Sequence, residues 1–151
     1  MNLRNYALGL AMLALALLHA PDAVAQQKAH SRALAVAGDT VWVVVNPVKP
    51  DKRAQFERFV NEIFWPSAAK LSAADQRTFR QTRVLNAVRP EADGTYAYLF
   101  IMDPVQRGFG YDILALLNKT YSKEKAADYY KLFTESLAGE QRTYVTVQTR
   151  F

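Results

Sequence analysis

Hydrophobic and polar residues along this chain follow two different periods, and the period changes from segment to segment. Short apolar or alternating runs, which are typical of strands, lie at residues 41–45, 82–88, 95–102 and 143–149. Apolar residues at the spacing of a helix face lie between the first two runs and between the last two. These helical positions are Phe56, Phe59, Val60, Ile63, Phe64, Ala126, Tyr129, Tyr130, Phe133 and Leu137.

Residues that favour the beginnings and ends of helices support this division. Pro50 suits the first turn of a helix, and Pro66 is expected to end the same helix. Ser72, followed by Asp75, resembles a capping box and predicts a short additional helix. Gly139 stands where the glycine that follows a helix end is expected.

A turn at Arg89–Gly94, which ends in Asp-Gly, joins the second and third strands into a hairpin. The element order is therefore β, α, β, β, α, β. Because crossovers are right-handed, this order leaves little topological choice. It predicts an α+β, ferredoxin-like fold in which a four-stranded antiparallel sheet carries two main helices on one face.

Alternation divides the predicted sheet into two faces. The smooth aliphatic set is expected to pack beneath the helices and comprises Val43, Val45, Ala97, Leu99, Ile101, Val145 and Val147. The other set is expected to face outward and comprises Trp42, Val44, Asn46, Tyr98, Phe100, Met102, Tyr144, Thr146 and Gln148. Soluble monomers seldom expose so large an aromatic patch. We therefore expect a homodimer whose interface contains Trp42, Tyr98, Phe100 and Tyr144, the alternative being a lone domain with an amphipathic outer face.

These elements together resemble the dimeric α+β barrel superfamily, and more loosely its antibiotic-biosynthesis-monooxygenase-type domains. The resemblance covers the whole predicted domain and rests on element order and pattern rather than on a diagnostic motif. It implies the barrel fold and a range of functions that includes cofactor-independent monooxygenases, haem-degrading enzymes, isomerases and stress-responsive domains. The fold alone does not choose among them.

The first 25 residues have the pattern of a secretory signal peptide. Arg4 lies in a positive N-terminal region, an uncharged apolar run follows, and Ala23-Val24-Ala25 has the small-x-small pattern that signal peptidase requires. The apolar run is shorter than the ~20 residues that a membrane anchor needs. We expect an exported protein, periplasmic or secreted and without stable membrane insertion, with a linker or flexible arm at 26–39 and the domain at 40–151.

Histidine and cysteine limit the chemistry that the predicted domain can perform. The only histidines, His19 and His30, precede it, and the chain has no cysteine. A His/Cys zinc site, a Ser-His-Asp triad and a Cys-His pair are therefore excluded from the domain. A haem-binding relative would be expected to present an axial histidine, so haem is not expected either. Acidic residues are scattered among basic ones, and we expect no metal and no cofactor.

The net charge of +5 includes a local cluster of Arg77, Arg80, Arg83 and Arg89. In an exported protein such a cluster favours solubility, or attraction to acidic ligands or envelope surfaces, over nucleic-acid binding.

Four residues are candidates for ligand binding: Asn46, Trp65, Arg107 and Tyr111. Trp65 could roof a pocket between helices and sheet, although edge packing is the simpler role. Arg107 and Tyr111 belong to a glycine-containing loop, which could act as a lid over an anionic group or could be a connector.

Three functions remain open at this stage. The first is a module that binds a small, aromatic or acidic ligand. The second is an enzyme resembling the cofactor-independent monooxygenases that act on aromatic substrates. The third is an interaction dimer with a filled core. An apolar pocket with a few converging polar groups would favour the first two.

Overall fold

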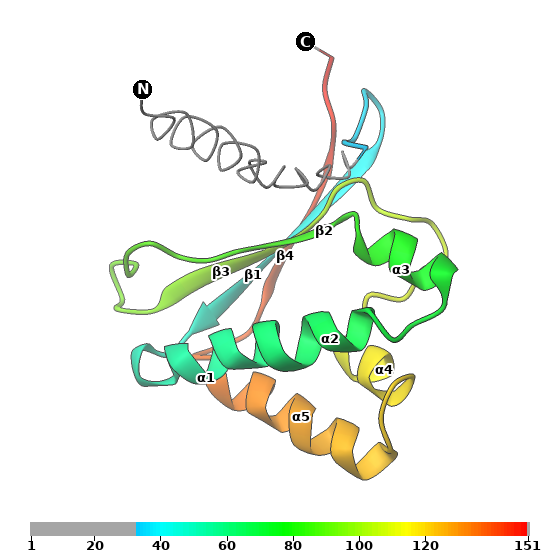
Figure 1. Ribbon diagram of the computed structural model, residues 1–151. Helices are drawn as coiled ribbons and strands as arrows, with labels where there is room; N and C mark the ends of the chain where they lie inside the picture. Colours follow the sequence, from blue (N-terminus) through cyan, green and yellow to red (C-terminus); the bar gives the residue numbers. More distant parts are fainter. Residues whose placement is uncertain (1–32, 151) are drawn as a thin grey trace, which may run out of the picture. The chain divides into compact units, whose positions relative to one another are not determined.

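The computed structural model describes residues 33–150, and Figure 1 shows their arrangement. Four strands form one antiparallel sheet in the order β2-β3-β1-β4. The strands are β1 (Thr40–Val48), β2 (Thr82–Leu85), β3 (Tyr96–Met102) and β4 (Arg142–Val147). Helices pack on one face of this sheet (Figure 1), which confirms the predicted ferredoxin-like α+β fold. The predicted signal peptide (residues 1–25) lies outside the described residues.

Part of the predicted arm is hydrogen-bonded to the domain. The backbone N–H of Ala35 donates to Asp103 Oδ1 at 2.9 Å. Gly38, whose φ of 95° suits glycine, donates to the carbonyl of Gln148 at 2.9 Å. Residues 33–39 thus join the folded unit, and the rest of the predicted arm (26–32) lies outside the described residues.

The first crossover is one helical run whose winding changes along its length. It comprises η1 (Pro50–Lys52), α1 (Arg53–Arg58), the π-helical η2 (Phe59–Phe64) and α2 (Trp65–Ala68). The prediction that Pro66 ends the helix is wrong, because the run continues to Ala68. In the wide turn before the proline, Trp65 N–H bonds to the carbonyl of Val60, which leaves room for the ring. The Ser67 hydroxyl donates to the carbonyl of Ile63 at 2.5 Å and supports the same turn.

Three further helices complete the helical layer: α3 (Ala73–Phe79), α4 (Ile113–Asn118) and α5 (Lys123–Ser136). Each begins at a side chain that accepts a backbone N–H, namely Ser72, Asp112 and Ser122. The prediction for Gly139 is wrong, since α5 ends at Ser136 and Leu137 is already extended. There the chain joins the sheet: Leu137 bridges to Val48, and Ala138 N–H donates to the carbonyl of Pro47 at 2.7 Å.

The predicted hairpin is present, but its first strand is shorter than expected. Pairing between β2 and β3 ends at Leu85, opposite Leu99. Two residues later the carbonyl of Ala87 accepts from Arg53 Nη2 at 3.1 Å, so it bonds a helix side chain rather than a neighbouring strand. The turn itself forms at Gly94, whose φ is 82° and whose N–H donates to Glu91.

On β1 and β3 the two faces of the sheet are exchanged relative to the prediction, whereas on β4 Val145 lies inward and Tyr144 outward as predicted. Tyr98 is fully buried and Phe100 is 6% exposed, and both contact Phe56 of α1. The inner face therefore carries the aromatic set, and its rows across the sheet are Thr82–Met102–Trp42–Val145 and Val84–Phe100–Val44–Thr143. The prediction that Trp42, Tyr98, Phe100 and Tyr144 form an outer dimer face is wrong, because only Tyr144 lies outward.

The outer face is aliphatic at its centre. Its rows are Arg83–Ile101–Val43–Tyr144 and Leu85–Leu99–Val45–Arg142. Leu85 is 42% exposed and Tyr144 51% exposed. No described helix covers this face (Figure 1), and although Val45 and Ile101 at its centre are each only 8% exposed, apolar side chains around them remain open to solvent.

Candidate functional site

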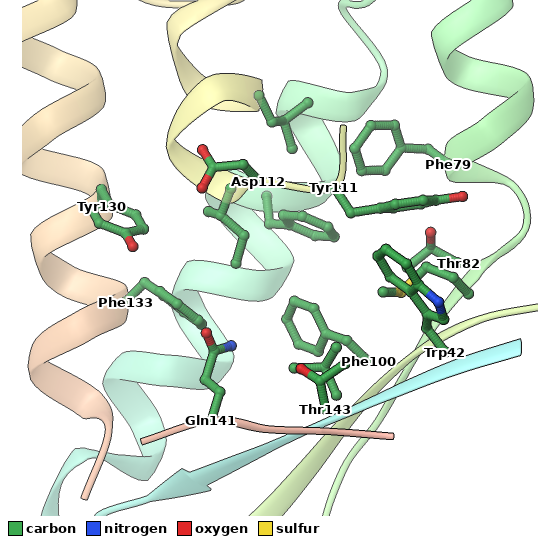
Figure 2. A pocket seen from close by; sticks show the side chains of 15 residues that line it. Trp42, Phe79, Thr82, Phe100, Tyr111, Asp112, Tyr130, Phe133, Gln141 and Thr143 are labelled. Atoms are coloured by element: carbon green, nitrogen blue, oxygen red, sulfur yellow. The ribbon is translucent and has the colours of Figure 1, made fainter. Parts of the chain in front are cut away.

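A pocket of about 280 Å³ lies between the inner face of the sheet and the helices (Figure 2). We call it the aromatic pocket, because seven of its fifteen lining residues carry aromatic rings. Its lining comprises Trp42, Val44, Phe64, Phe79, Thr82, Phe100, Met102, Tyr111, Asp112, Ile113, Leu116, Tyr130, Phe133, Gln141 and Thr143.

The alternation of the strands supplies one wall of the pocket, and the helices supply the other. Trp42 and Phe100 project from adjacent strands on the inner face. Trp42 meets Tyr111 at a ring-centroid distance of 5.7 Å, and Phe100 meets Phe64 at 5.4 Å. Such tilted ring pairs add to the stability gained from burial and fix the shape of the walls.

One polar atom in the pocket is both buried and unpartnered. Thr82 lies on the edge strand β2 and is 8% exposed, and its Oγ1 has no hydrogen-bond partner among the described residues. A buried hydroxyl without a partner costs roughly 1–3 kcal/mol. A ligand group that hydrogen-bonds this oxygen would recover that cost.

A second polar group lies at the opposite edge of the sheet. Gln141 directly precedes β4, and its Nε2 donates to Oδ1 of Asn46 at 2.5 Å. Asn46 is fully buried and in turn donates to the carbonyl of Tyr98 at 3.1 Å. Asn46 thus holds the Gln141 side chain in place, and Gln141 itself is exposed at the mouth of the pocket.

The loop that leads into α4 contributes two further polar groups, and Tyr130 of α5 and Thr143 of β4 add hydroxyls. Asp112 lines the pocket at the start of the helix, and its Oδ1 accepts from Ala115 N–H at 2.6 Å. The hydroxyl of the neighbouring Tyr111 accepts from Gln106 N–H at 2.9 Å. Burial raises the pKa of Tyr111, so this phenol stays protonated at neutral pH.

The predicted ligand residues do not form one site. Only Tyr111 lines the aromatic pocket, while Asn46 acts one layer behind it through Gln141. Trp65 packs edge-on against Phe64 at 4.9 Å and lines a separate depression beside Phe79. Arg107 is exposed and lines another depression, with Trp42 at its edge.

Sequence reasoning missed Thr82, Gln141 and Asp112. Each stands at the boundary of a strand or a helix, where polar residues are expected for local structural reasons. Thr82 gives the clearest signal in retrospect, because it is an inward-facing polar residue in the same row as Met102 and Trp42.

A separate polar cluster ties α1 to β3. The Tyr98 hydroxyl donates to Glu57 Oε1 and accepts from Arg53 Nε at 2.9 Å, and Arg53 Nε also lies 3.0 Å from Glu57 Oε1. Burial and the hydrogen bond to Glu57 raise the pKa of Tyr98 to about 12. Hydrogen bonds from Tyr98 and Arg53 lower the pKa of Glu57. Because these groups satisfy one another, the cluster fastens the helix to the sheet.

Two further findings concern residues 33–150 as a whole. None of the helices in this range has both the length and the apolar character needed to cross a membrane. Within the same range, no three His, Asp or Glu side chains gather closely enough to hold a metal ion.

The fold and pocket define a ferredoxin-like α+β domain with an aromatic cavity between helices and sheet. No protein-family model matches the chain, and no curated protein matches it significantly. Two solved structures are similar to it. One is a proposed antibiotic biosynthesis monooxygenase from Caulobacter crescentus CB15, with 16% sequence identity over 76% of this chain and 92% of that chain and a TM-score of 0.41. The other is a proposed antibiotic biosynthesis monooxygenase from Bordetella bronchiseptica, with 16% identity over 75% of this chain and 99% of that chain and a TM-score of 0.40. Both are of the type that the element pattern resembled. The fold assignment depends on the strand order itself.

Proposed function

We propose that this protein is an exported module that binds a small aromatic molecule in the aromatic pocket. The observation that carries the proposal is the combination of an aromatic cavity with the unpartnered hydroxyl of Thr82. Ligand sites are typically concave and mostly apolar, with a few polar groups that fix the orientation of the ligand. Thr82 at one edge of the sheet and Gln141 at the other fit that description.

Native mass spectrometry of the gently purified protein tests this proposal. We expect added mass from a small molecule, which the variant Thr82→Val loses because valine keeps the shape and removes the hydroxyl. Thr78→Val is the matched control, since Thr78 is also buried but does not line the pocket. If Thr82→Val and wild type retain the same ligand equally well, Thr82 does not hold it and the proposal loses its main support.

A second candidate is an oxygen-dependent reaction on the bound aromatic molecule. It is favoured by the position of Thr82, whose hydroxyl could hold a phenolic oxygen against the rings of Trp42 and Phe100. Oxygen uptake with simple phenols and quinols, abolished in Thr82→Val, would favour catalysis over binding alone. If a phenol or quinol binds but no oxygen is consumed, the protein is a binding module and not an enzyme for that ligand.

Export is proposed from the N-terminal pattern alone. Signal peptidase cleavage after Ala25 would leave Gln26 as the first residue of the mature protein. Intact mass and N-terminal sequencing of the protein recovered from the cell envelope and from the medium test the cleavage. They also distinguish a periplasmic from a secreted product. A full-length protein confined to the cytoplasm would contradict the proposal.

We also propose that a second copy covers the outer face of the sheet. Val43 and Leu99 are partly exposed on this face, and Leu85 and Tyr144 are more exposed beside them. Two such faces can therefore pack together about a two-fold axis. Light scattering should give a dimer for wild type and a monomer for Val43→Lys. Val88→Lys is the control, because Val88 is 95% exposed and lies outside the sheet. A monomeric wild type at micromolar concentration would refute this proposal.

A further inference from the structure

The aromatic pocket has an electrostatic character unlike that of the chain as a whole. The chain carries a net charge of +5, yet Asp112 is the only charged residue that lines the pocket. The arginines of the basic cluster lie elsewhere: Arg83 pairs with Asp103 at 2.8 Å on the outer face, and Arg80 lines the depression beside Trp65. An anionic ligand would therefore meet one carboxylate and no cation.

Two side chains at the mouth, Gln141 and Asp112, have oxygen atoms that can accept hydrogen bonds from a ligand. Gln141 donates one Nε2 hydrogen to Asn46, and its Oε1 is available to accept. Asp112 uses Oδ1 to accept from Ala115, and no hydrogen bond from a described residue reaches its Oδ2. Figure 2 shows Asp112, Tyr130 and Gln141 along the α5 side of the pocket, away from Thr82. A ligand group that donates hydrogen bonds would therefore find two acceptors here, one of them a carboxylate.

The rings next to the mouth add to this preference. The ring centroids of Tyr130 and Phe133 of α5 are 6.0 Å apart, and those of Phe133 and Phe100 are 6.5 Å apart. The faces of aromatic rings attract cations, and the attraction strengthens where water is partly excluded. Ring faces, a carboxylate and an amide oxygen are together suited to an ammonium group.

We infer that the ligand is an aromatic amine, with its ring inside the aromatic pocket and its ammonium group at the mouth beside Asp112 and Gln141. This inference rests on the proposed function and names the class of ligand. It replaces the acidic ligand that the basic composition had left open. Arg107, which could have paired with an acid, does not line the pocket.

Three probes of nearly one shape test the inference by calorimetry on the purified full chain: 2-phenylethylamine, 2-phenylethanol and phenylacetate. We expect the amine to bind about tenfold more tightly than the alcohol, the gain typical of one charge-assisted hydrogen bond, and the acid to bind most weakly. In Asp112→Asn the preference for the amine over the alcohol should fall to about twofold, because the amine loses more from the missing carboxylate than the alcohol does. Asparagine still caps α4, so the helix is preserved.

The control is Asp128→Asn, which makes the same change in net charge at an exposed position of α5 outside the pocket. It should leave all three affinities unchanged. If the alcohol binds as tightly as the amine, or the acid binds most tightly, the inference is overturned while the proposed function stands. If none of the three probes binds, the inference and the proposed function both fall. If both variants lose the preference for the amine equally, that preference arises from the net charge of the protein, and the inference is overturned.

Discussion

Replacing Thr82 by valine should stabilise the ligand-free protein. Most changes in a packed interior destabilise, so the expected sign is unusual and follows directly from the geometry. Thr82 is 8% exposed, and its hydroxyl has no partner among the described residues. Valine has nearly the same shape and is favoured in strands, so the variant removes an unsatisfied polar atom without opening a cavity.

The size of the effect follows from the surroundings of Thr82. An unsatisfied buried hydroxyl costs roughly 1–3 kcal/mol, and the lower end applies here because solvent reaches part of the pocket. We therefore expect the free energy of unfolding to rise by about 1 kcal/mol. For a domain of this size that corresponds to an increase in Tm of about 4 °C.

Urea unfolding followed by circular dichroism, on protein freed of bound ligand, measures this change. Thr120→Val is the matched comparison, because the Thr120 hydroxyl donates to the carbonyl of Leu117 at 3.2 Å and its loss should destabilise by about 1 kcal/mol. The two substitutions are chemically identical and should have opposite signs. If Thr82→Val destabilises as much as Thr120→Val, the hydroxyl has a partner in solution and the reasoning fails.

Three other predictions concern the framework around the pocket. In denaturant titrations Tyr98→Phe should lower the free energy of unfolding by about 2 kcal/mol, because it removes a hydroxyl that bonds two charged groups. The control is Tyr129→Phe, because the Tyr129 hydroxyl has no such bonds among the described residues. It should change the free energy of unfolding by less than about 0.5 kcal/mol. The pKa of Tyr98 is raised to about 12, above the usual value of about 10, so the unfolded state loses its proton first and stability should fall as pH rises from about 10 to 12. Unfolding curves of wild type and Tyr98→Phe should converge over that range, and a constant gap would contradict the assignment. Ser72→Ala removes the cap of α3 and should lower the free energy of unfolding by about 1 kcal/mol in the same assay. An unchanged free energy would show that the cap does not stabilise the protein.

The sequence predicted the order of the elements well because each element has its own period. The strand at Val41–Val45, the helix that follows Pro50 and the capping serine Ser72 all depend on local physics, and the structure contains them. The ends of elements were less predictable, since they depend on distant partners. The Arg53 side chain donates to the carbonyl of Ala87, although the two residues are far apart in sequence. Because this carbonyl bonds a helix side chain, it does not extend the pairing of β2.

The choice of face could not be made from alternation. A strand with period two is unchanged when its two faces are exchanged, so alternation identifies two sets but not which set lies inward. The helices decide it here: Phe56 and Phe133 are bulky, and they pack against the equally bulky Phe100 at 6.3 and 6.5 Å. The phase of β4 relative to β1 was also undetermined by pattern, and pairing places Val145 opposite Trp42 rather than beside Val43.

The candidate site was predictable only in part, for a related reason. Tyr111 was found because its loop combines aromatic residues with glycines. Arg107 was proposed from the same loop, and Trp65 was proposed as an aromatic roof between helices and sheet; both lie in other depressions. Thr82 becomes informative only once the inward face of β2 is known, because its hydroxyl is unremarkable until burial leaves it without a partner.

The π-helical turn in the first crossover determines the direction in which the side chains after it point around the helix axis. In a regular α-helix each residue advances about 100°, so Phe64, eight positions after Phe56, would point about 80° away from it. The looser winding of Phe59–Phe64 cancels much of that offset, and both rings reach Phe100, at 6.3 and 5.4 Å. Deleting one exposed residue here, such as Asn61, would restore regular winding and place Phe64 seven positions after Phe56, about 20° from it around the helix axis. Phe64 would then still point toward the pocket, so the wide turn accommodates one extra residue in the crossover while both rings stay against Phe100.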